Sequence, residues 1–174
     1  VRSSAASDVY KRQVLIGMPG AGKSTIGVHI ADRLNLKFVD TDKLLENEIG
    51  DSIQSFLDSH GYIELRKLEE RIILRESLDN RVIATGGSAV YSKNSMKYLK
   101  SQAKVIFLNV SEKELEKRIN NFSSRGIARK PGQSFSSLFR ERQKLYLKSC
   151  DYEINTDDIS IQATLGMVEK IARS

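Results

Sequence analysis

The stretch IGMPGAGKST, residues 16–25, decides the fold class of this chain. Gly17, Gly22, Lys23 and Ser24 fit a phosphate-binding pattern: a glycine, four variable positions, a second glycine, a lysine and a hydroxyl residue. The glycines allow successive backbone N–H groups to point into one concavity, and the helix that follows adds the positive end of its dipole. The lysine can then reach the β- and γ-phosphates, and the hydroxyl group can ligate the Mg²⁺ that bridges them. The stretch therefore predicts binding of a nucleoside triphosphate with Mg²⁺.

The segments around this loop alternate between strand and helix patterns. The apolar run VLIG precedes the loop, and the segment from Lys23 to Leu34 repeats apolar residues at helical spacing. Further strand patterns occur at LKFVD (36–40), RVIATGGS (81–88), KVIFLNV (104–110) and YEINT (152–156). Further helix patterns occur at KLLENEIG (43–50), DSIQSFLDSH (51–60), YIELRKLEERIILRESL (62–78), SEKELEKRI (111–119), SFSSLFRERQKLYLKSC (134–150) and from Ser160 onward. Short apolar strands that alternate with helices indicate an α/β fold, with a parallel sheet covered on both faces.

Several residues are expected to set a helix end or the buried face of a helix. Asp40 or Thr41 can cap the helix that begins in KLLENEIG, and Gly61 separates the two helices after it. Ser111 and Glu114 form a capping box, in which each side chain satisfies an orphan N–H group of the other residue. In the second of the two helices around Gly61, the residues expected to face inward are Ile63, Leu65, Leu68, Ile72 and Leu78.

Length and composition restrict the class of protein. At 174 residues and 19.6 kDa the chain is long enough for one domain, which we place at residues 14–174, and short for two. No apolar run approaches the roughly 20 residues that a bilayer span needs, and nothing resembles a secretory signal, so we expect a cytoplasmic protein without membrane contact. A single cysteine, Cys150, excludes an internal disulfide, and no His or Cys cluster has zinc spacing.

The first thirteen residues, VRSSAASDVYKRQ, show neither helical nor strand periodicity and resemble a translated sequencing adapter. We therefore predict that residues 1–13 are a non-native tail. Three basic residues against one acidic residue give this tail a charge of +2, which leaves +4 of the net charge of +6 for the remainder. That modest excess suits an enzyme for anionic ligands, and we expect no nucleic-acid partner.

The class of nucleotide enzyme follows from the segments that accompany the loop. A GTPase would carry a guanine-reading Asn-Lys-x-Asp tetrapeptide, which the sequence lacks. An ATPase motor would usually close an apolar strand with an acidic residue, whereas VIAT closes with Thr85. These two observations favour a small-molecule kinase. Asp40 and Asp42 have the spacing for divided roles, one toward Mg²⁺ and one toward an acceptor hydroxyl, although two solvated carboxylates at a helix start would show the same spacing.

Several segments, taken together, resemble the shikimate kinase family across essentially everything after residue 13. They are GMPGAGKSTIG, FVDTD, SIQSFLDSHGYIELRKLE, VIATGGS, ERQKLY and INT, in the family's order and at about its spacing. The resemblance implies a nucleoside monophosphate kinase-like fold in three layers, with five parallel strands in the order 2-3-1-4-5 and a lid. It also implies a monomer that transfers the γ-phosphoryl group of ATP, with Mg²⁺, to the 3-hydroxyl group of shikimate.

The resemblance assigns roles to residues around the nucleotide. Lys23, Asp42 and Arg125 are implied to be catalytic, with Arg125 as the lid arginine that closes over the phosphates. Asp40 is implied to hold Mg²⁺ through water, together with Ser24. The residues implied to bind the nucleotide are Gly20, Ala21, Gly22, Lys23, Ser24, Thr25, Arg118, which would stack near adenine, and Arg125. The composition of RGIARKPGQ, which contains the lid arginine, is typical of a mobile loop.

On the acceptor side, the resemblance implies that Asp42 is the base that hydrogen-bonds the acceptor hydroxyl groups. Arg66 and Arg142 are implied to bind the substrate carboxylate, for which the planar guanidinium fork is better suited than lysine. From the residues alone, an arginine on a charged helix could equally be a solvated surface residue. The remaining residues implied to bind substrate form a glycine turn: Gly86, Gly87 and Ser88.

Three positions depart from the family's pattern, and each touches the acceptor pocket or the lid. Ser88 stands where the family has its third glycine, Leu65 where it has a phenylalanine, and Gly126 where the lid has a proline. Two alternatives therefore stay open. One is a kinase of the same fold with another hydroxy-acid or amino-acid acceptor, such as homoserine. The other is a non-catalytic nucleotide-binding or nucleic-acid-binding protein, for which the pI of 9.4 is the motivation.

Overall fold

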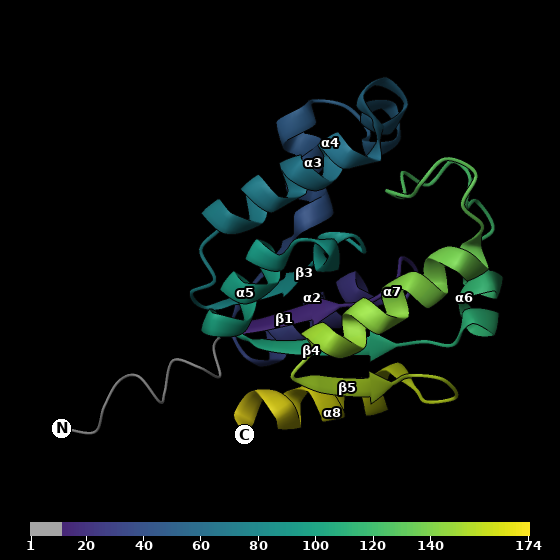
Figure 1. Cartoon of the computed structure of the whole chain (residues 1–174). Helices are drawn as coiled ribbons and strands as arrows, with labels where there is room; N and C mark the ends of the chain where they lie inside the picture. Colours follow the sequence, from purple (N-terminus) through teal and green to yellow (C-terminus); the bar gives the residue numbers. More distant parts are fainter. Residues whose placement is uncertain (1–11) are drawn as a thin grey trace.

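A parallel sheet of five strands forms the centre of the molecule in this computed structural model, which describes residues 12–174 (Figure 1). The strands are β1 (Arg12–Ile16), β2 (Lys37–Asp40), β3 (Arg81–Ala84), β4 (Lys104–Asn109) and β5 (Tyr152–Asn155). They lie in the order β2-β3-β1-β4-β5, and every neighbouring pair is parallel. The predicted α/β fold and strand order are confirmed. Because β1 lies between β3 and β4, the loop that follows it leaves from the middle of the sheet.

Helices cover both faces of this sheet (Figure 1). They are α2 (Lys23–Arg33), α3 (Thr41–Ile49), α4 (Ile53–Arg75), the short 3₁₀ helix η2 (Ala89–Tyr91), α5 (Lys93–Gln102), α6 (Glu112–Arg118), α7 (Phe135–Ser149) and α8 (Ile161–Arg173). Helix α2 packs on β1, β2 and β3 and contacts α8, whereas α5 and α7 pack on β4. The chain between α6 and α7, residues 119–134, is the lid, and Figure 1 shows it arching toward α3 and α4. None of the helices between residues 12 and 174 combines the length and apolar character that a membrane span requires.

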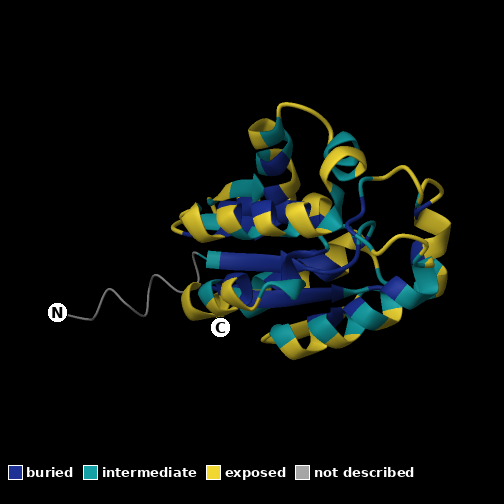
Figure 2. Cartoon of the chain, turned by 45° about the horizontal axis from the view of Figure 1, so that its top comes forward, coloured by how far each residue is buried: buried dark blue, intermediate teal, exposed yellow. Residues whose placement is uncertain are grey.

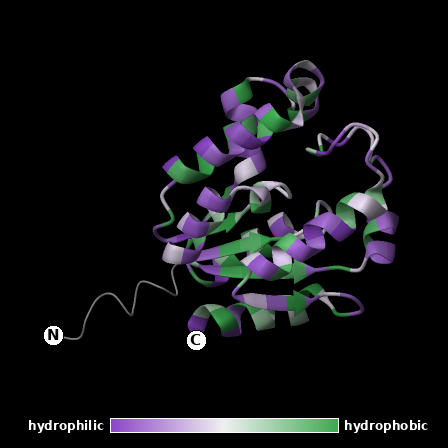
Figure 3. Cartoon of the chain, viewed as in Figure 1, coloured by the Kyte–Doolittle hydropathy of each residue, from purple (hydrophilic) through white to green (hydrophobic). Residues whose placement is uncertain are grey.

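Two apolar clusters hold these layers together. The larger one contains the buried residues of β1 and β4, which lie between helices whose outer faces are exposed (Figure 2). Figure 3 shows the same contrast in hydropathy, with hydrophobic strands and largely hydrophilic outer helix surfaces. The smaller cluster joins Leu45 of α3 to Leu65, Leu68 and Ile72 of α4 and to Ala128 of the lid. This second cluster therefore attaches the lid to α3 and α4.

The first strand begins earlier than the sequence pattern predicts. The predicted non-native tail, residues 1–13, ends inside β1, because Arg12 and Gln13 pair in register with Arg81 and Val82 of β3. Gln13 is fully buried, and this polar residue interrupts the apolar pattern from which a strand is predicted. Residues 1–11 lie outside the described part of the chain, so the prediction for them stays a prediction.

Two further details of the helices differ from the sequence-based expectation. No element is predicted between residues 89 and 103, where η2 and α5 lie. Ile63 is 55% exposed and does not face inward. The backbone of Gly61 (φ 81°, ψ 169°) interrupts α4, so the predicted break at this glycine is confirmed. At about 100° per residue, Ile63 lies about 140° from Leu68 and about 180° from Ile72, so it projects from the opposite face of the helix.

The helix ends agree with the sequence in part. Asp40 caps α3, as predicted, by accepting a hydrogen bond from the N–H group of Asp42. The capping box at α6 is only half formed. Ser111 Oγ accepts from the N–H group of Glu114 at 3.3 Å, but the N–H group of Ser111 donates to Asp157 Oδ1 at 3.0 Å. A carboxylate from the segment after β5 therefore replaces the reciprocal bond that the pattern predicts.

Gly27 allows α2 to lie close to β2. A Cβ atom on this glycine would overlap the ring of Phe38, whose Cδ2 would lie only 3.0 Å away. We expect Gly27→Ala to lower the free energy of unfolding by about 1–2 kcal/mol, because overpacking costs more than the helix propensity of alanine contributes. Thermal unfolding would show this change as a fall in Tm of about 2–8 °C for a domain of this size.

Gly166 of α8 provides the matched control for this substitution. It is exposed, and apart from its two chain neighbours and the nearby backbone of its own helix, no atom of residues 12–174 lies within 4 Å of a Cβ placed on it. Gly166→Ala should therefore raise the free energy of unfolding, by up to about 1 kcal/mol, through helix propensity alone. A shift of the same sign in both variants would contradict the packing argument for Gly27.

Candidate active site

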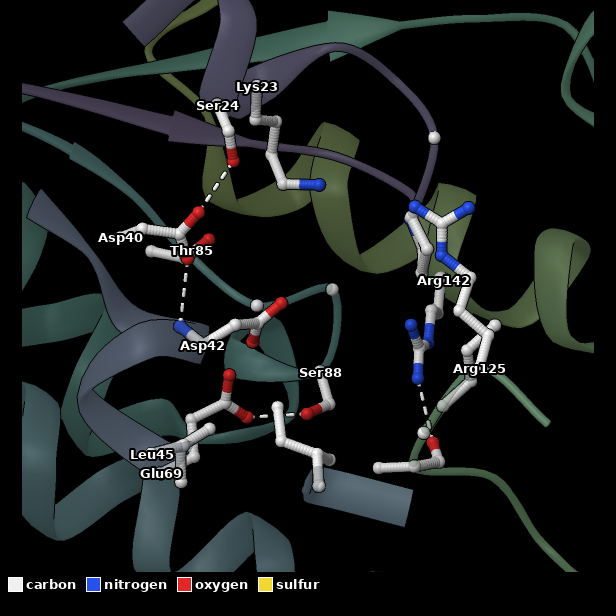
Figure 4. A pocket seen from close by; sticks show the side chains of 18 of the residues that line it. Lys23, Ser24, Asp40, Asp42, Leu45, Glu69, Thr85, Ser88, Arg125 and Arg142 are labelled. Atoms are coloured by element: carbon white, nitrogen blue, oxygen red, sulfur yellow. Dashed lines mark hydrogen bonds between the residues drawn. The ribbon is translucent and has the colours of Figure 1, made fainter. Parts of the chain in front are cut away.

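One cavity of about 430 Å³ lies at the carboxyl ends of β1, β2 and β3 (Figure 4). This edge of a parallel sheet is where ligands bind in α/β folds. The predicted site residues on its lining are Gly20, Gly22, Lys23, Ser24, Thr25, Asp40, Asp42, Gly86, Gly87, Ser88, Arg118, Arg125 and Arg142. The other two predicted residues lie beside it: Ala21 lines a neighbouring cavity, and Arg66 contacts the lid next to Arg142. The fold therefore gathers residues that are far apart in the sequence.

The loop between β1 and α2 has the backbone shape that an anion site requires. Gly20 (φ 83°) and Gly22 (φ 88°) adopt the left-handed conformation, which residues with a Cβ atom rarely adopt. Helix α2 has no side-chain cap, so the N–H groups of its first turn remain available to a ligand. The loop therefore offers oriented N–H groups at the positive end of the α2 dipole.

Lys23 lies inside this loop. Its Nζ donates hydrogen bonds to the carbonyl oxygens of Gly17 and Met18, both at 2.8 Å. Burial lowers the pKa of Lys23 from 10.5 to about 8, while the nearby Asp42 and Asp40 carboxylates oppose that change. The ammonium group is therefore charged at neutral pH and already faces the cavity side of the loop. A phosphate group bound there would offer it a full negative charge in place of carbonyl dipoles.

Ser24 and Asp40, the residues predicted to hold Mg²⁺, meet at the cavity wall. Ser24 Oγ donates to Asp40 Oδ2 at 2.6 Å (Figure 4). Hydroxyl and carboxylate oxygens are hard ligands that suit Mg²⁺. Within residues 12–174, no group of three or more His, Cys, Asp and Glu side chains could hold a metal ion. A cation at this pair would therefore take its remaining ligands from water and phosphate oxygens.

Asp42, at the start of α3, points into the cavity (Figure 4). Burial raises the pKa of Asp42, the Asp40 carboxylate raises it further, and Lys23 opposes both. A carboxylate whose pKa lies above its usual value accepts a proton more readily near neutral pH. Gly86 leaves space next to it, because a Cβ atom on this glycine would lie 2.6 Å from Asp42 Oδ1. The arrangement therefore provides a base with room for a ligand beside it.

Glu69 of α4 is a site residue that the sequence-based prediction missed. It is buried, its Oε2 accepts a hydrogen bond from the Ser88 hydroxyl, and its Oε1 has no partner among the described residues. Burial raises the pKa of Glu69 from 4.5 to about 7; the Ser88 hydrogen bond lowers it, and the Asp42 charge raises it. One signal was present in the sequence, since this acidic residue lies on the apolar stripe between Leu68 and Ile72.

The buried carboxyl group of Glu69 predicts a pH dependence of stability. Its pKa is raised from 4.5 to about 7, so the stability from its protonation is present at low pH and lost as the pH rises through that window. Glu69→Gln removes the titration and keeps an oxygen for Ser88. At about pH 8 we expect the variant to exceed the parent by on the order of 3 kcal/mol in the free energy of unfolding. Near pH 4.5, denaturant titrations should give the same free energy of unfolding for the parent and for Glu69→Gln. A difference that stays constant from pH 4.5 to about pH 8 would contradict the raised pKa of Glu69.

Arg66 of α4 and Arg142 of α7, the predicted carboxylate-binding pair, converge on one atom. Both donate from Nη2 to the carbonyl oxygen of Ala128 in the lid, at 3.4 and 2.7 Å respectively. The guanidinium carbon of Arg66 lies 3.5 Å from the centroid of the Tyr91 ring, and that of Arg142 lies 5.6 Å from the same centroid. The Nε atom of each arginine has no hydrogen-bond partner within residues 12–174. Two cationic groups with unused donors therefore lie side by side.

Tyr91 and Gly87 make this arrangement possible, and Tyr91 was not predicted. The Tyr91 hydroxyl donates to Glu141 Oε1 at 2.5 Å, which fixes the ring on which the arginines stack. A Cβ atom on Gly87 would lie 2.6 Å from Nη1 of Arg142 and 2.9 Å from Cδ of Pro19. Only a glycine therefore allows the guanidinium group to approach the turn this closely.

Arg125 lines the main cavity from the lid, and Arg118 also lines a second cavity of about 260 Å³ beside the phosphate-binding loop. Arg118 Nη1 donates to the carbonyl oxygen of Gly20 at 3.4 Å. The full lining of the second cavity is Ala21, Gly22, Thr25, Ile26, Arg118, Thr156, Ile159, Ile161 and Thr164. Its place next to the loop and its mixture of apolar and hydroxyl side chains suit a purine base. The residues from the segment after β5 were not named by the sequence-based prediction.

Comparisons with known proteins agree with this geometry. The family model for shikimate kinase matches residues 19–172. A shikimate kinase of Paracidovorax citrulli is 37% identical over 148 residues, which cover 82% of this chain and 81% of that protein. One of Vibrio campbellii is 35% identical over 167 residues, which cover 92% and 96%. The solved shikimate kinase from Acinetobacter baumannii in complex with shikimate has a TM-score of 0.82 and 25% identity over 92% of each chain. The chain therefore belongs to the shikimate kinase family.

Proposed function

We propose that this protein transfers the γ-phosphoryl group of ATP to the 3-hydroxyl group of shikimate, which gives ADP and shikimate 3-phosphate. The observation that supports the proposal most directly is the placement of Arg66 and Arg142, with unused donors, on the same lid carbonyl beside the cavity that holds Asp42. A ring that carries one carboxylate and several hydroxyl groups has the charges that these residues complement. The solved relative from Acinetobacter baumannii contains shikimate, which supports the same substrate.

ATP would bind with its phosphates at the loop and its base in the second cavity. Lys23 would exchange its two carbonyl partners for phosphate oxygens, and the free N–H groups at the start of α2 would bind the same phosphates. Ser24 and Asp40 would hold Mg²⁺, which neutralises part of the phosphate charge when it is bound. Thr156 and Ile159 would contact the adenine base together with Arg118.

In the transfer step, the acceptor hydroxyl oxygen attacks the γ-phosphorus. The bond from this phosphorus to the β–γ bridging oxygen breaks, ADP leaves with the electron pair, and the hydroxyl proton passes to Asp42. Arg125 would face the charge that develops on the transferred group. The lid residues Gly126, Ile127 and Ala128 line the same cavity and would exclude water, which otherwise competes as an acceptor.

A coupled assay of ADP release with a panel of acceptors tests this proposal. The panel contains shikimate, its methyl ester, homoserine and a sample without acceptor, each with ATP and Mg²⁺. We expect turnover with shikimate far above the acceptor-free rate, and much weaker turnover with the ester because it lacks the carboxylate charge. Shikimate turnover no faster than background hydrolysis would reject the proposal.

An amino-acid alcohol such as homoserine is the second candidate acceptor. The observation that favours it is the buried Glu69 Oε1, which has no partner among the described residues and could pair with a substrate ammonium group. Faster turnover of homoserine than of shikimate in the same panel would favour this candidate. No turnover with any acceptor, combined with salt-sensitive binding to duplex DNA or RNA, would favour a non-catalytic binding protein.

We further propose that the protein acts as a monomer in the cytoplasm, without a nucleic-acid partner. A single chain supplies the loop, α3, α4, α7 and the lid around the cavity, so the proposed site needs no residue from a second copy. Light scattering after size-exclusion chromatography should give the mass of one chain. A dimer at micromolar concentration would contradict this part of the proposal.

A further inference from the structure

The lid contacts the first turn of α4 next to the arginine that would face the phosphates. The N–H group of Gly126, which follows Arg125, donates a hydrogen bond of 2.8 Å to Oε1 of Gln54. Gly126 has φ 70°, and a Cβ atom on it would lie 3.1 Å from the backbone nitrogen of Gln54 and 3.2 Å from Cβ of Ile53. A residue with a side chain would be strained in this conformation and crowded in this space. The lid backbone therefore lies directly against α4.

A second hydrogen bond orients the side-chain amide of Gln54 for this contact. Its Nε2 donates to Oδ1 of Asp58, one turn further along α4, at 2.7 Å. An amide group has one oxygen and one NH₂ group, so the partner of one atom decides which way the other atom points. An ionised carboxylate only accepts hydrogen bonds, so Asp58 selects the orientation in which Oε1 faces Gly126. The contacts thus run from Asp58 through Gln54 to the lid.

The lid has a second attachment two residues further on. The carbonyl oxygen of Ala128 accepts the hydrogen bond of Arg142, and Ile127 between the two attachments is buried. The segment from Gly126 to Ala128 is therefore held by Gln54 at one end and by Arg142, with Arg66, at the other. Gln54 binds the N–H group of the peptide bond that joins Arg125 to Gly126. The direction of the Arg125 side chain therefore depends on this hydrogen bond.

We propose that Gln54 is a positioning residue for phosphoryl transfer, and that it acts by fixing the lid backbone next to Arg125. This inference rests on the proposed function. A proline at position 126 would have no N–H group and a φ near −65°, so the contact depends on the glycine of this chain. Without Gln54 the lid keeps its attachment at Ala128, but Arg125 samples more directions. The fraction of productive complexes then falls, while the acceptor site itself is unchanged.

A double-mutant cycle tests the link between Gln54 and Arg125. Rates of phosphoryl transfer to shikimate are measured for the parent chain, Gln54→Ala, Arg125→Ala and the double variant. We expect Gln54→Ala to lower kcat about tenfold, to change the KM for shikimate less than about twofold, and to have no further effect when Arg125 is already alanine. The proposal would be overturned if Gln54→Ala left kcat unchanged, or if it lowered kcat by the same factor in the parent and in Arg125→Ala.

Two further variants separate positioning from a general loss of structure. In Gln54→Glu combined with Asp58→Asn, one carboxylate oxygen of the new side chain at position 54 still accepts from Gly126, and the other accepts from the new amide at position 58. This pair should therefore restore most of the kcat that Gln54→Ala loses. Ser59→Ala is the control. Ser59 is on the same helix but lines a different cavity, with Ile49 and His60, on the side away from the lid, so this variant should keep the parent kcat. Failure of the paired variant to recover any activity would contradict a role for the acceptor oxygen.

Limited trypsin digestion separates failure of this inference from failure of the proposed function. The lid contains Arg125 and Arg129 as cleavage sites, and cleavage there depends on backbone opening and not on the acceptor. Without any substrate, we expect faster cleavage at these sites in Gln54→Ala than in the parent or in Ser59→Ala. If the parent does not phosphorylate shikimate but shows this difference, the proposed function fails and the lid contact stands. Equal cleavage rates in all three proteins would overturn the inference, even for an active enzyme.

Discussion

Replacement of Asp42 by asparagine should lower kcat about 10³-fold, with little change in the KM for ATP. Asparagine has nearly the same size and can still hydrogen-bond an acceptor hydroxyl group, but it cannot take the proton that the transfer step releases. The parent enzyme should also lose activity as the pH falls through the pKa of Asp42, which burial raises above its ordinary value. Steady-state ADP release as a function of pH measures both effects, and the acidic limb should be absent in the variant.

The same substitution should not weaken the fold. Because burial raises the pKa of Asp42, the folded state holds its proton more tightly than the unfolded state, and that stability is lost as the pH rises through the folded pKa. At neutral pH, Asp42→Asn should therefore have a Tm equal to or above that of the parent. Asp32→Asn, an exposed control on α2, should change neither kcat nor Tm. A kcat for Asp42→Asn within about tenfold of the parent would contradict the role of base.

Arg142→Lys should raise the KM for shikimate about 100-fold, with a much smaller effect on the KM for ATP. Lysine keeps the positive charge but not the planar fork, so one ammonium group cannot serve the Ala128 carbonyl and a carboxylate in fixed geometry. The arginine is only 1% exposed, so solvent cannot replace the lost donors. Kinetics with each substrate varied in turn measure the two KM values.

Arg140→Lys is the matched control for this substitution. It makes the same change on the same helix at an exposed position, and should leave both KM values unchanged. Shikimate methyl ester provides a second comparison, because a substrate without the carboxylate charge should hardly distinguish Arg142→Lys from the parent. If Arg142→Lys raised the KM for the ester as much as the KM for shikimate, Arg142 would not act through the carboxylate.

Much of the fold follows from short-range patterns. Apolar runs predict the central strands, since a strand covered on both faces needs apolar side chains throughout. Helix α5 lacks such a signal, because only Ser95, Met96 and Leu99 of KNSMKYLKSQ are buried. The exposure of Ile63 could have been predicted, because at about 100° per residue it lies about 140° from Leu68 and about 180° from Ile72, on the opposite face of the helix.

The predicted site residues are those that would touch a ligand through their side chains, and the missed contacts are of another kind. The role of Ala128 depends on a backbone carbonyl, which every residue has, so no side-chain pattern indicates it. Glu69 lies on the apolar stripe of its helix, but this signal is weak in a helix with many charges, and the burial of the side chain makes its place clear. Gln54 and Gly126 are 72 positions apart, and no pattern in the sequence indicates that they are in contact in the folded chain.

The carbonyl oxygen of Ala128 supplies only a partial negative charge to the two arginine side chains that bind it. A carbonyl dipole offsets little of two full positive charges, and burial together with the Arg142 charge lowers the pKa of Arg66. Any small oxyanion of suitable shape should relieve this repulsion, sulfate above all. The affinity measured for a carboxylated acceptor should therefore depend on the buffer salt, and be highest where that salt supplies no competitor.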